Sequence, residues 1–128
     1  MINLGYAALG LDGAAFKAAA GALDANSVEL SEAVGSIAGK DKGAAFLQVW
    51  RSHISDFVTY AKGEATGDQA LKDTGLANLD AYRTASGDFF AAITGGALPS
   101  EAVATELIGH IETLAGAIDS LRVALVKA

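Results

Sequence analysis

The chain of 128 residues contains no cysteine and one proline, and it has few basic residues, 9 against 15 acidic ones. The missing cysteines exclude disulfides, thiolate zinc sites, iron–sulfur clusters and thiol nucleophiles. Long apolar runs are missing too, because no segment has the roughly 18 to 20 consecutive apolar residues that a membrane-spanning helix needs. The net charge of -6 argues against binding to nucleic acid or to an anionic membrane surface. We therefore expect neither a nucleic-acid partner nor membrane insertion.

The sequence also lacks common catalytic motifs. The sequence has no Gly-x-Ser-x-Gly elbow, no phosphate-binding loop and no His-Glu-x-x-His zinc motif. A ferritin-like di-iron site needs a glutamate three residues before a histidine, and those positions hold Trp50 and Leu107. Ser52 and His53 are adjacent, but neighbours on a helix do not face one another, so no nucleophile triad is implied. The sequence predicts a protein that is not an enzyme, with no catalytic residues.

What the chain does contain is helical periodicity, with apolar residues at spacings of three and four between alanine, glutamate, lysine and glutamine. The pattern predicts helices over about 13–38, 42–65 and 69–94, and a fourth that starts at Pro99 or Ser100. Asp68 is placed to cap the third helix through its side-chain oxygen. The apolar stripe of the first helix is expected to reach Leu30 and Ile37. We expect an all-α fold, an up-down-up-down four-helix bundle, with residues 1–128 as a single domain.

The two halves of the chain resemble each other. His53-Ile54 and Phe57 align with His110-Ile111 and Leu114, and Leu23-Asp24-Ala25 aligns with Leu79-Asp80-Ala81. The predicted repeat covers approximately 13–65 and 69–127, so the bundle is interpreted as a duplicated helical hairpin. Asp24 and Asp80 repeat with it, and pairing with arginine is one interpretation of both.

The two histidines of the chain, His53 and His110, occupy equivalent positions in this repeat. His53 falls near the centre of its apolar stripe, whereas His110 falls near the edge of its own. Facing histidines in a bundle can ligate haem axially or bind copper through neutral imidazole nitrogens. In that hypothesis His53 and His110 are the metal ligands, and the cofactor is walled by Trp50, Phe57 and Tyr60.

A second interpretation needs no ligand. A histidine on an apolar helix face is more often a core residue satisfied by one hydrogen bond, for which Asp56 or Glu106 on a neighbouring turn are the candidate partners. Duplication copies core residues as readily as ligands. Both interpretations stay open at this point.

A set of short segments also resembles a known group of proteins. These include Leu23-Asp24-Ala25-Asn26-Ser27 and the motif WR-x-HI-x-x-FV-x-Y, which begins at Trp50 and ends at Tyr60. With His110-Ile111 near the end, they resemble largely uncharacterised exported bacterial helical-bundle proteins of a modular type. The resemblance implies an extracellular or cell-envelope location and use as a module, but no activity. The Met1–Gly10 segment lacks the pattern of a signal peptide.

Together these observations predict a non-enzymatic structural or interaction module of an exported bacterial protein. Its partner would be another protein or a second copy of the chain. The alternative is a haem- or copper-binding four-helix bundle that uses the paired site of His53 and His110.

Overall fold

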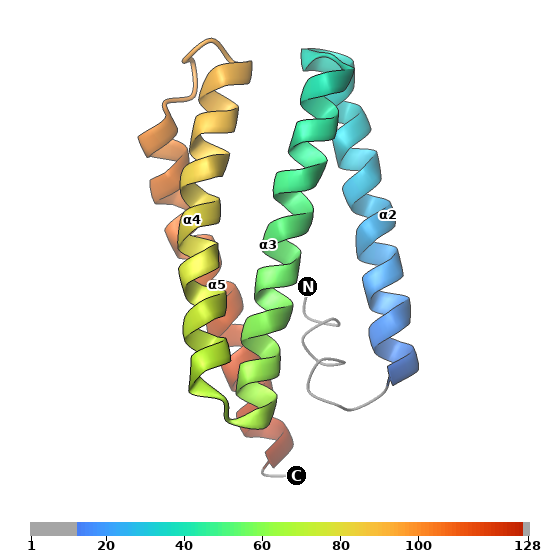
Figure 1. Cartoon of the computed structure of the whole chain (residues 1–128), viewed down its shortest axis with the longest axis vertical. Helices are drawn as coiled ribbons and strands as arrows, with labels where there is room; N and C mark the ends of the chain where they lie inside the picture. Colours follow the sequence, from blue (N-terminus) through green and yellow to red (C-terminus); the bar gives the residue numbers. More distant parts are fainter. Residues whose placement is uncertain (1–12, 127–128) are drawn as a thin grey trace.

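The computed structural model describes residues 13–126 and confirms an all-α chain. Its helices are α2 (Gly13–Ala38), α3 (Lys40–Thr66), α4 (Gln69–Ile93) and α5 (Ser100–Val126). They run alternately up and down (Figure 1), as predicted, and their bounds agree with the predicted ones to within a turn. No helix in this part of the chain is long and apolar enough to cross a membrane. The Met1–Gly10 segment lies outside the described residues.

The turns follow from local backbone chemistry. Gly39 and Gly67 have φ angles of 100° and 71°, which favour glycine because a side chain would be strained there. Asp68 caps α4 as predicted, since its carboxylate accepts a hydrogen bond from the Leu71 backbone N–H at 3.1 Å. The connections are short, so consecutive helices are antiparallel neighbours.

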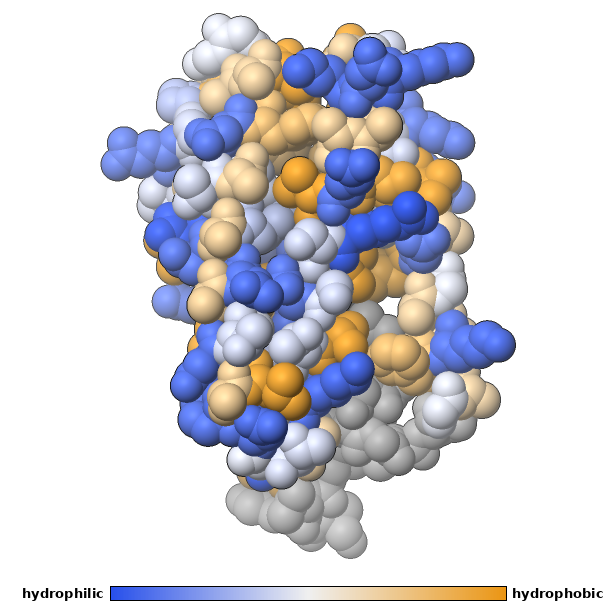
Figure 2. All heavy atoms as spheres, viewed as in Figure 1, coloured by the Kyte–Doolittle hydropathy of each residue, from blue (hydrophilic) through white to orange (hydrophobic). Residues whose placement is uncertain are grey.

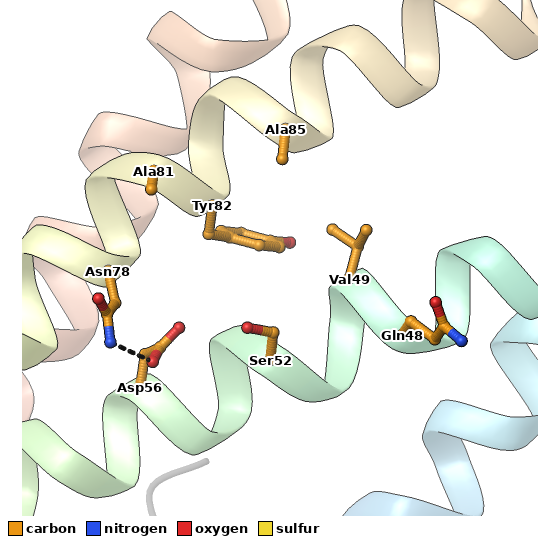
Figure 3. A pocket seen from close by; sticks show the side chains of 8 residues that line it. All are labelled: Gln48, Val49, Ser52, Asp56, Asn78, Ala81, Tyr82 and Ala85. Atoms are coloured by element: carbon orange, nitrogen blue, oxygen red, sulfur yellow. Dashed lines mark hydrogen bonds between the residues drawn. The ribbon is translucent and has the colours of Figure 1, made fainter.

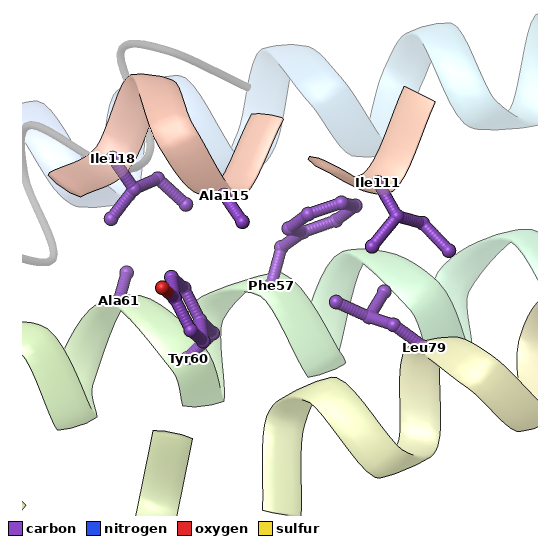
Figure 4. Close-up of a cluster of buried hydrophobic side chains, with 7 residues drawn as sticks. All are labelled: Phe57, Tyr60, Ala61, Leu79, Ile111, Ala115 and Ile118. Atoms are coloured by element: carbon purple, nitrogen blue, oxygen red, sulfur yellow. The ribbon is translucent and has the colours of Figure 1, made fainter. Parts of the chain in front are cut away.

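The main core lies among α3, α4 and α5. Figure 4 shows its side chains pointing toward one another from the three helices. The cluster consists of Phe57, Tyr60 and Ala61 from α3, Leu79 from α4, and Ile111, Ala115 and Ile118 from α5. Because α3 contacts each of the other three helices, it is the central element of the bundle.

The contact between α2 and α3 is built from small residues instead. Ser27 and Ser31 are buried on α2, and a Cβ atom added to Gly43 of α3 would lie 2.5 Å from the Ser31 carbonyl oxygen. The two helices are thus close at the Gly39 turn, and they diverge toward the other end of the bundle (Figure 1). Within residues 13–126, α2 has at most marginal contact with α4 and α5, so this side of the bundle is open.

The open side corrects part of the predicted apolar stripe. Ile37 is 89% exposed and Leu30 is 37% exposed, although both were expected to face a core. The reason is that α2 packs against one helix along a narrow line of small residues. Among the described residues, an apolar side chain away from that line is covered in part, as Leu30 is, or left in solvent, as Ile37 is.

Candidate functional site

His53 lies inside an aromatic cluster on the central helix. Its side chain is buried, with 2% exposure, and its ring stacks on Tyr82 of α4 with centroids 4.5 Å apart and an interplanar angle of 17°. Trp50 and Phe57 meet the same imidazole edge-on, at centroid distances of 4.5 Å and 6.0 Å. The structure therefore brings three of the predicted site residues together on α3, and it adds Tyr82.

The hydrogen bond of His53 fixes its tautomer. Nδ1 bonds to the backbone carbonyl of Trp50, and because a carbonyl can only accept, Nδ1 carries the proton. Burial lowers the pKa of His53 to about 4, the Trp50 bond opposes this, and the nearby charge of His110 lowers the pKa further. The ring is accordingly neutral near pH 7, with a lone pair on Nε2.

Trp50 leaves a polar atom unsatisfied in the same cluster. Its indole Nε1 is buried and has no hydrogen-bond partner among residues 13–126, whereas its ring stacks on Phe46 at 5.3 Å. A buried donor without a partner costs about 1 to 3 kcal/mol. The cluster thus places an unpaired N–H close to the His53 imidazole.

The other two predicted site residues lie elsewhere. Tyr60 belongs to the core near α5, and its hydroxyl donates to Asp119 Oδ1 at 2.9 Å. Burial and this hydrogen bond raise the pKa of Tyr60 to about 12. His110 is exposed on α5, as its position at the stripe edge suggested. The described residues contain no group of three or more histidine, aspartate or glutamate side chains that could hold a metal ion.

Sequence reasoning missed the partners that lie across helices. The expected carboxylate partner of His53 was wrong, because the Trp50 carbonyl takes that place and Asp56 Oδ1 accepts from Asn78 Nδ2 of α4 at 3.0 Å. Spacing along one helix gave no signal for the Asn78 contact. The aspartates of the repeat do pair with arginine, Asp24 with Arg51 and Asp80 with Arg83.

An ion-pair network around the buried Glu64 connects three helices near the turn between α3 and α4. Glu64 is 3% exposed, and its carboxylate binds Lys72 of α4 and Arg122 of α5, the latter at 3.2 Å. The Lys72 ammonium also lies 5.7 Å from the centre of the Tyr60 ring. All charges in this group are paired, which indicates a structural role in fixing how α3, α4 and α5 align.

Where α2 diverges from α3, the two helices enclose a groove of about 270 Å³. Most of its wall is apolar, and the Arg51–Asp24 ion pair lies in it, with Nε and Oδ1 2.7 Å apart. On the face seen in Figure 2, apolar surface gathers over the α2 and α3 pair. The lining residues are Phe16, Ala20, Leu23 and Asp24 from α2, and Arg51, Ile54, Ser55 and Val58 from α3.

Within the described residues, the fold and these sites define an acidic helical bundle with one open side. No protein-family profile, curated protein or solved structure matches the chain.

Proposed function

We propose that the chain is a non-enzymatic helical interaction module that associates with a second copy of itself through the groove between α2 and α3. The observation that supports this is the open side of the bundle. Within residues 13–126 no other helix covers the groove, whereas the far side of α3 is covered by α4 and α5.

The shape and chemistry of the groove favour a helical occupant. Phe16 and Leu23 on α2 and Ile54 and Val58 on α3 follow helical spacing, so their exposed parts form two apolar lines, one on each side of the groove. A second copy presents the same two lines. When two such pairs meet about a two-fold axis, each copy supplies the helices that the other lacks.

Charge sets the conditions for this association. Each copy has a net charge of -6, so two copies repel one another at low ionic strength. The groove itself adds little to the repulsion, because Asp24 is paired with Arg51. Salt screens this electrostatic repulsion between copies, so we expect the dimer to become more stable as salt is added.

Sedimentation equilibrium over about a hundredfold concentration range tests the proposal, since mass action favours the dimer at high concentration. The mass of the wild type should rise above the 12.9 kDa of one chain and approach twice that value. Val58→Asp, which puts a charge in the groove, should stay monomeric. Val123→Asp is the matched control, because Val123 is 51% exposed on α5 and should leave the dimer intact. A wild type that is monomeric at every concentration and salt would contradict the proposal.

The location of the module belongs to the same proposal. We place it in the cell envelope or outside the cell, on the resemblance to exported bacterial modules. The duplicated hairpin also remains a prediction.

A second candidate function is haem or copper binding at His53, with His110 as the second ligand. The specific observation in its favour is the Nδ1 bond to the Trp50 carbonyl, because metal-ligating histidines commonly bind a carbonyl through one nitrogen and the metal through the other. No hydrogen bond to Nε2 of His53 is found within residues 13–126. His110 would have to turn inward from the surface to complete the pair.

Haem titration followed in the Soret band tests this candidate. A saturable one-to-one spectrum of a six-coordinate haem, lost in both His53→Ala and His110→Ala, would support paired ligation. Copper can be followed by fluorescence, since the chain has one tryptophan and its ring centroid lies 4.5 Å from that of His53. No saturable change with either would eliminate this candidate and leave the interaction module.

A further inference from the structure

A second groove, between α3 and α4, has a different chemistry from the groove at α2. Its volume is about 520 Å³, and it opens where small side chains face each other across the two helices (Figure 3). Gly75 brings the backbones close beside it, because a Cβ at that position would lie 3.0 Å from the Asp56 carbonyl oxygen. The residues that line it are Gln48, Val49, Ser52, Asp56, Asn78, Ala81, Tyr82 and Ala85.

Asp56 is the unusual member of this lining. The residue is 8% exposed, yet no basic side chain within residues 13–126 forms an ion pair with it, and its described partner is the Asn78 amide on Oδ1. A buried carboxylate normally needs a cation or several hydrogen bonds to offset its lost hydration. Figure 3 shows the other oxygen directed into the groove, on the side of Tyr82. The groove therefore offers a negative charge that no described protein group neutralises.

The Ser52 hydroxyl is a further acceptor, and it points along the groove toward Asp56 (Figure 3). Asn78 binds Asp56 through its N–H, and its carbonyl oxygen is turned away from Ser52 and Tyr82 (Figure 3). The remaining walls combine the Gln48 amide with apolar or aromatic groups from Val49, Ala81, Ala85 and Tyr82. A carboxylate, a hydroxyl acceptor and a largely apolar wall suit an ammonium group that carries a short alkyl chain.

We propose that this groove binds a small primary ammonium compound, with Asp56 as the counter-ion and Ser52 as a further acceptor. A metal ion fits less well, because no cluster of three candidate ligands occurs among the described residues. The net charge of -6 raises the local concentration of any small cation. The site is on α3 and α4, so it does not depend on the groove at α2.

An NMR titration of the ¹⁵N-labelled protein with n-butylammonium chloride, at constant ionic strength, tests the proposal. The expected result is saturable shifts of amides in 48–56 of α3 and 78–85 of α4. The neutral analogue n-butanol should not shift them. The absence of saturable shifts, or equal shifts with n-butanol, would overturn the proposal.

Variants separate a specific site from general attraction to an acidic protein. Asp56→Asn keeps the shape of the side chain and removes its charge, and the affinity should fall at least about tenfold. Glu29→Gln removes one charge from the exposed face of α2 and should leave the affinity unchanged. Equal losses in both variants would show that only net charge matters, which would contradict the site.

A third variant covers the case in which Asp56→Asn fails to fold. Ala85→Leu fills the groove without changing any charge, and Ala85 is an exposed residue at the groove wall. Binding of n-butylammonium should be lost while the amide spectrum away from the groove is preserved. Unchanged binding in Ala85→Leu would place the ammonium elsewhere and overturn the proposal.

Discussion

At the scale of single residues, the main feature of the aromatic cluster is the buried, neutral imidazole of His53. Its ring lies between those of Tyr82 and Trp50, and its Nδ1–H donates a hydrogen bond to the Trp50 carbonyl. Burial keeps the ring neutral by lowering its pKa to about 4, from an ordinary value of 6.5. The folded state consequently resists protonation of a side chain that the unfolded chain protonates freely.

This difference predicts a dependence of stability on pH. Between pH 6.5 and 4 the unfolded chain binds a proton at His53 and the folded chain does not, so stability falls as the pH falls through this range. From pH 7 to pH 5 the free energy of unfolding should drop by about 2 kcal/mol, measured by urea denaturation. His53→Phe should remove most of this slope, whereas His110→Gln, at an exposed position, should keep it. If the free energy of unfolding depended on pH equally in His53→Phe and the wild type, His53 would not be the group responsible.

At the scale of the helices, glycine determines how closely α2 and α3 approach. Gly43 faces the Ser31 carbonyl at a distance that leaves no room for a methyl group. Gly21 is also helical, but a Cβ there would have nothing within 4 Å. Glycine in place of alanine lowers helix propensity equally at the two positions, so the positions differ only in how closely they are packed.

Alanine substitutions at the two glycines should have opposite effects. Gly43→Ala forces the helices apart and should lower the free energy of unfolding by about 1 to 3 kcal/mol, a typical cost of overpacking. Gly21→Ala should raise it by up to about 1 kcal/mol, because alanine is the better helix former. Thermal and urea denaturation of both variants would check this. Stabilisation by Gly43→Ala would show that the crossing is looser than described.

The helices could be predicted from the sequence, because their bounds depend on local signals such as the Asp68 cap and the glycine turns. The burial of His53 and the exposure of His110 also followed from their positions in the helical stripe. The contacts of His53 with Tyr82 and of Asp56 with Asn78 could not be predicted, since they depend on how α3 and α4 are rotated about their axes. The exposure of Ile37 was missed because the sequence does not show that, among the described helices, α2 packs mainly against α3.

At the scale of the whole molecule, three helices form a unit and the fourth rests on one side of it. Glu64 connects α3 to Lys72 on α4 and to Arg122 on α5, which supports the apolar core beside it. Among residues 13–126 the contact of α2 has no comparable network, and its ion pair, between Asp24 and Arg51, is exposed. In this part of the chain the bundle is therefore well packed at α3, α4 and α5 and open beside α2.

Removing the acidic charge from the buried and from the exposed ion pair should change the free energy of unfolding by different amounts. Glu64→Gln leaves two cations beside a buried amide and should cost about 2 kcal/mol in urea denaturation, because buried charge pairs are expensive to break. Asp24→Asn breaks an exposed pair that water and salt already screen, so no measurable change is expected. A larger loss from Asp24→Asn than from Glu64→Gln would reverse this ranking.

The central claim, that a second copy covers the groove between α2 and α3, is tested most directly by paramagnetic broadening between copies. Because the chain has no cysteine, Lys62→Cys on the exposed face of α3 provides a unique site for a spin label. Labelled protein without ¹⁵N is mixed with unlabelled ¹⁵N protein in high salt, so that any broadening is intermolecular. The expected result is broadening confined to amides of 16–24 and 51–58. No broadening at any concentration, or broadening centred on α4 and α5, would contradict the claim.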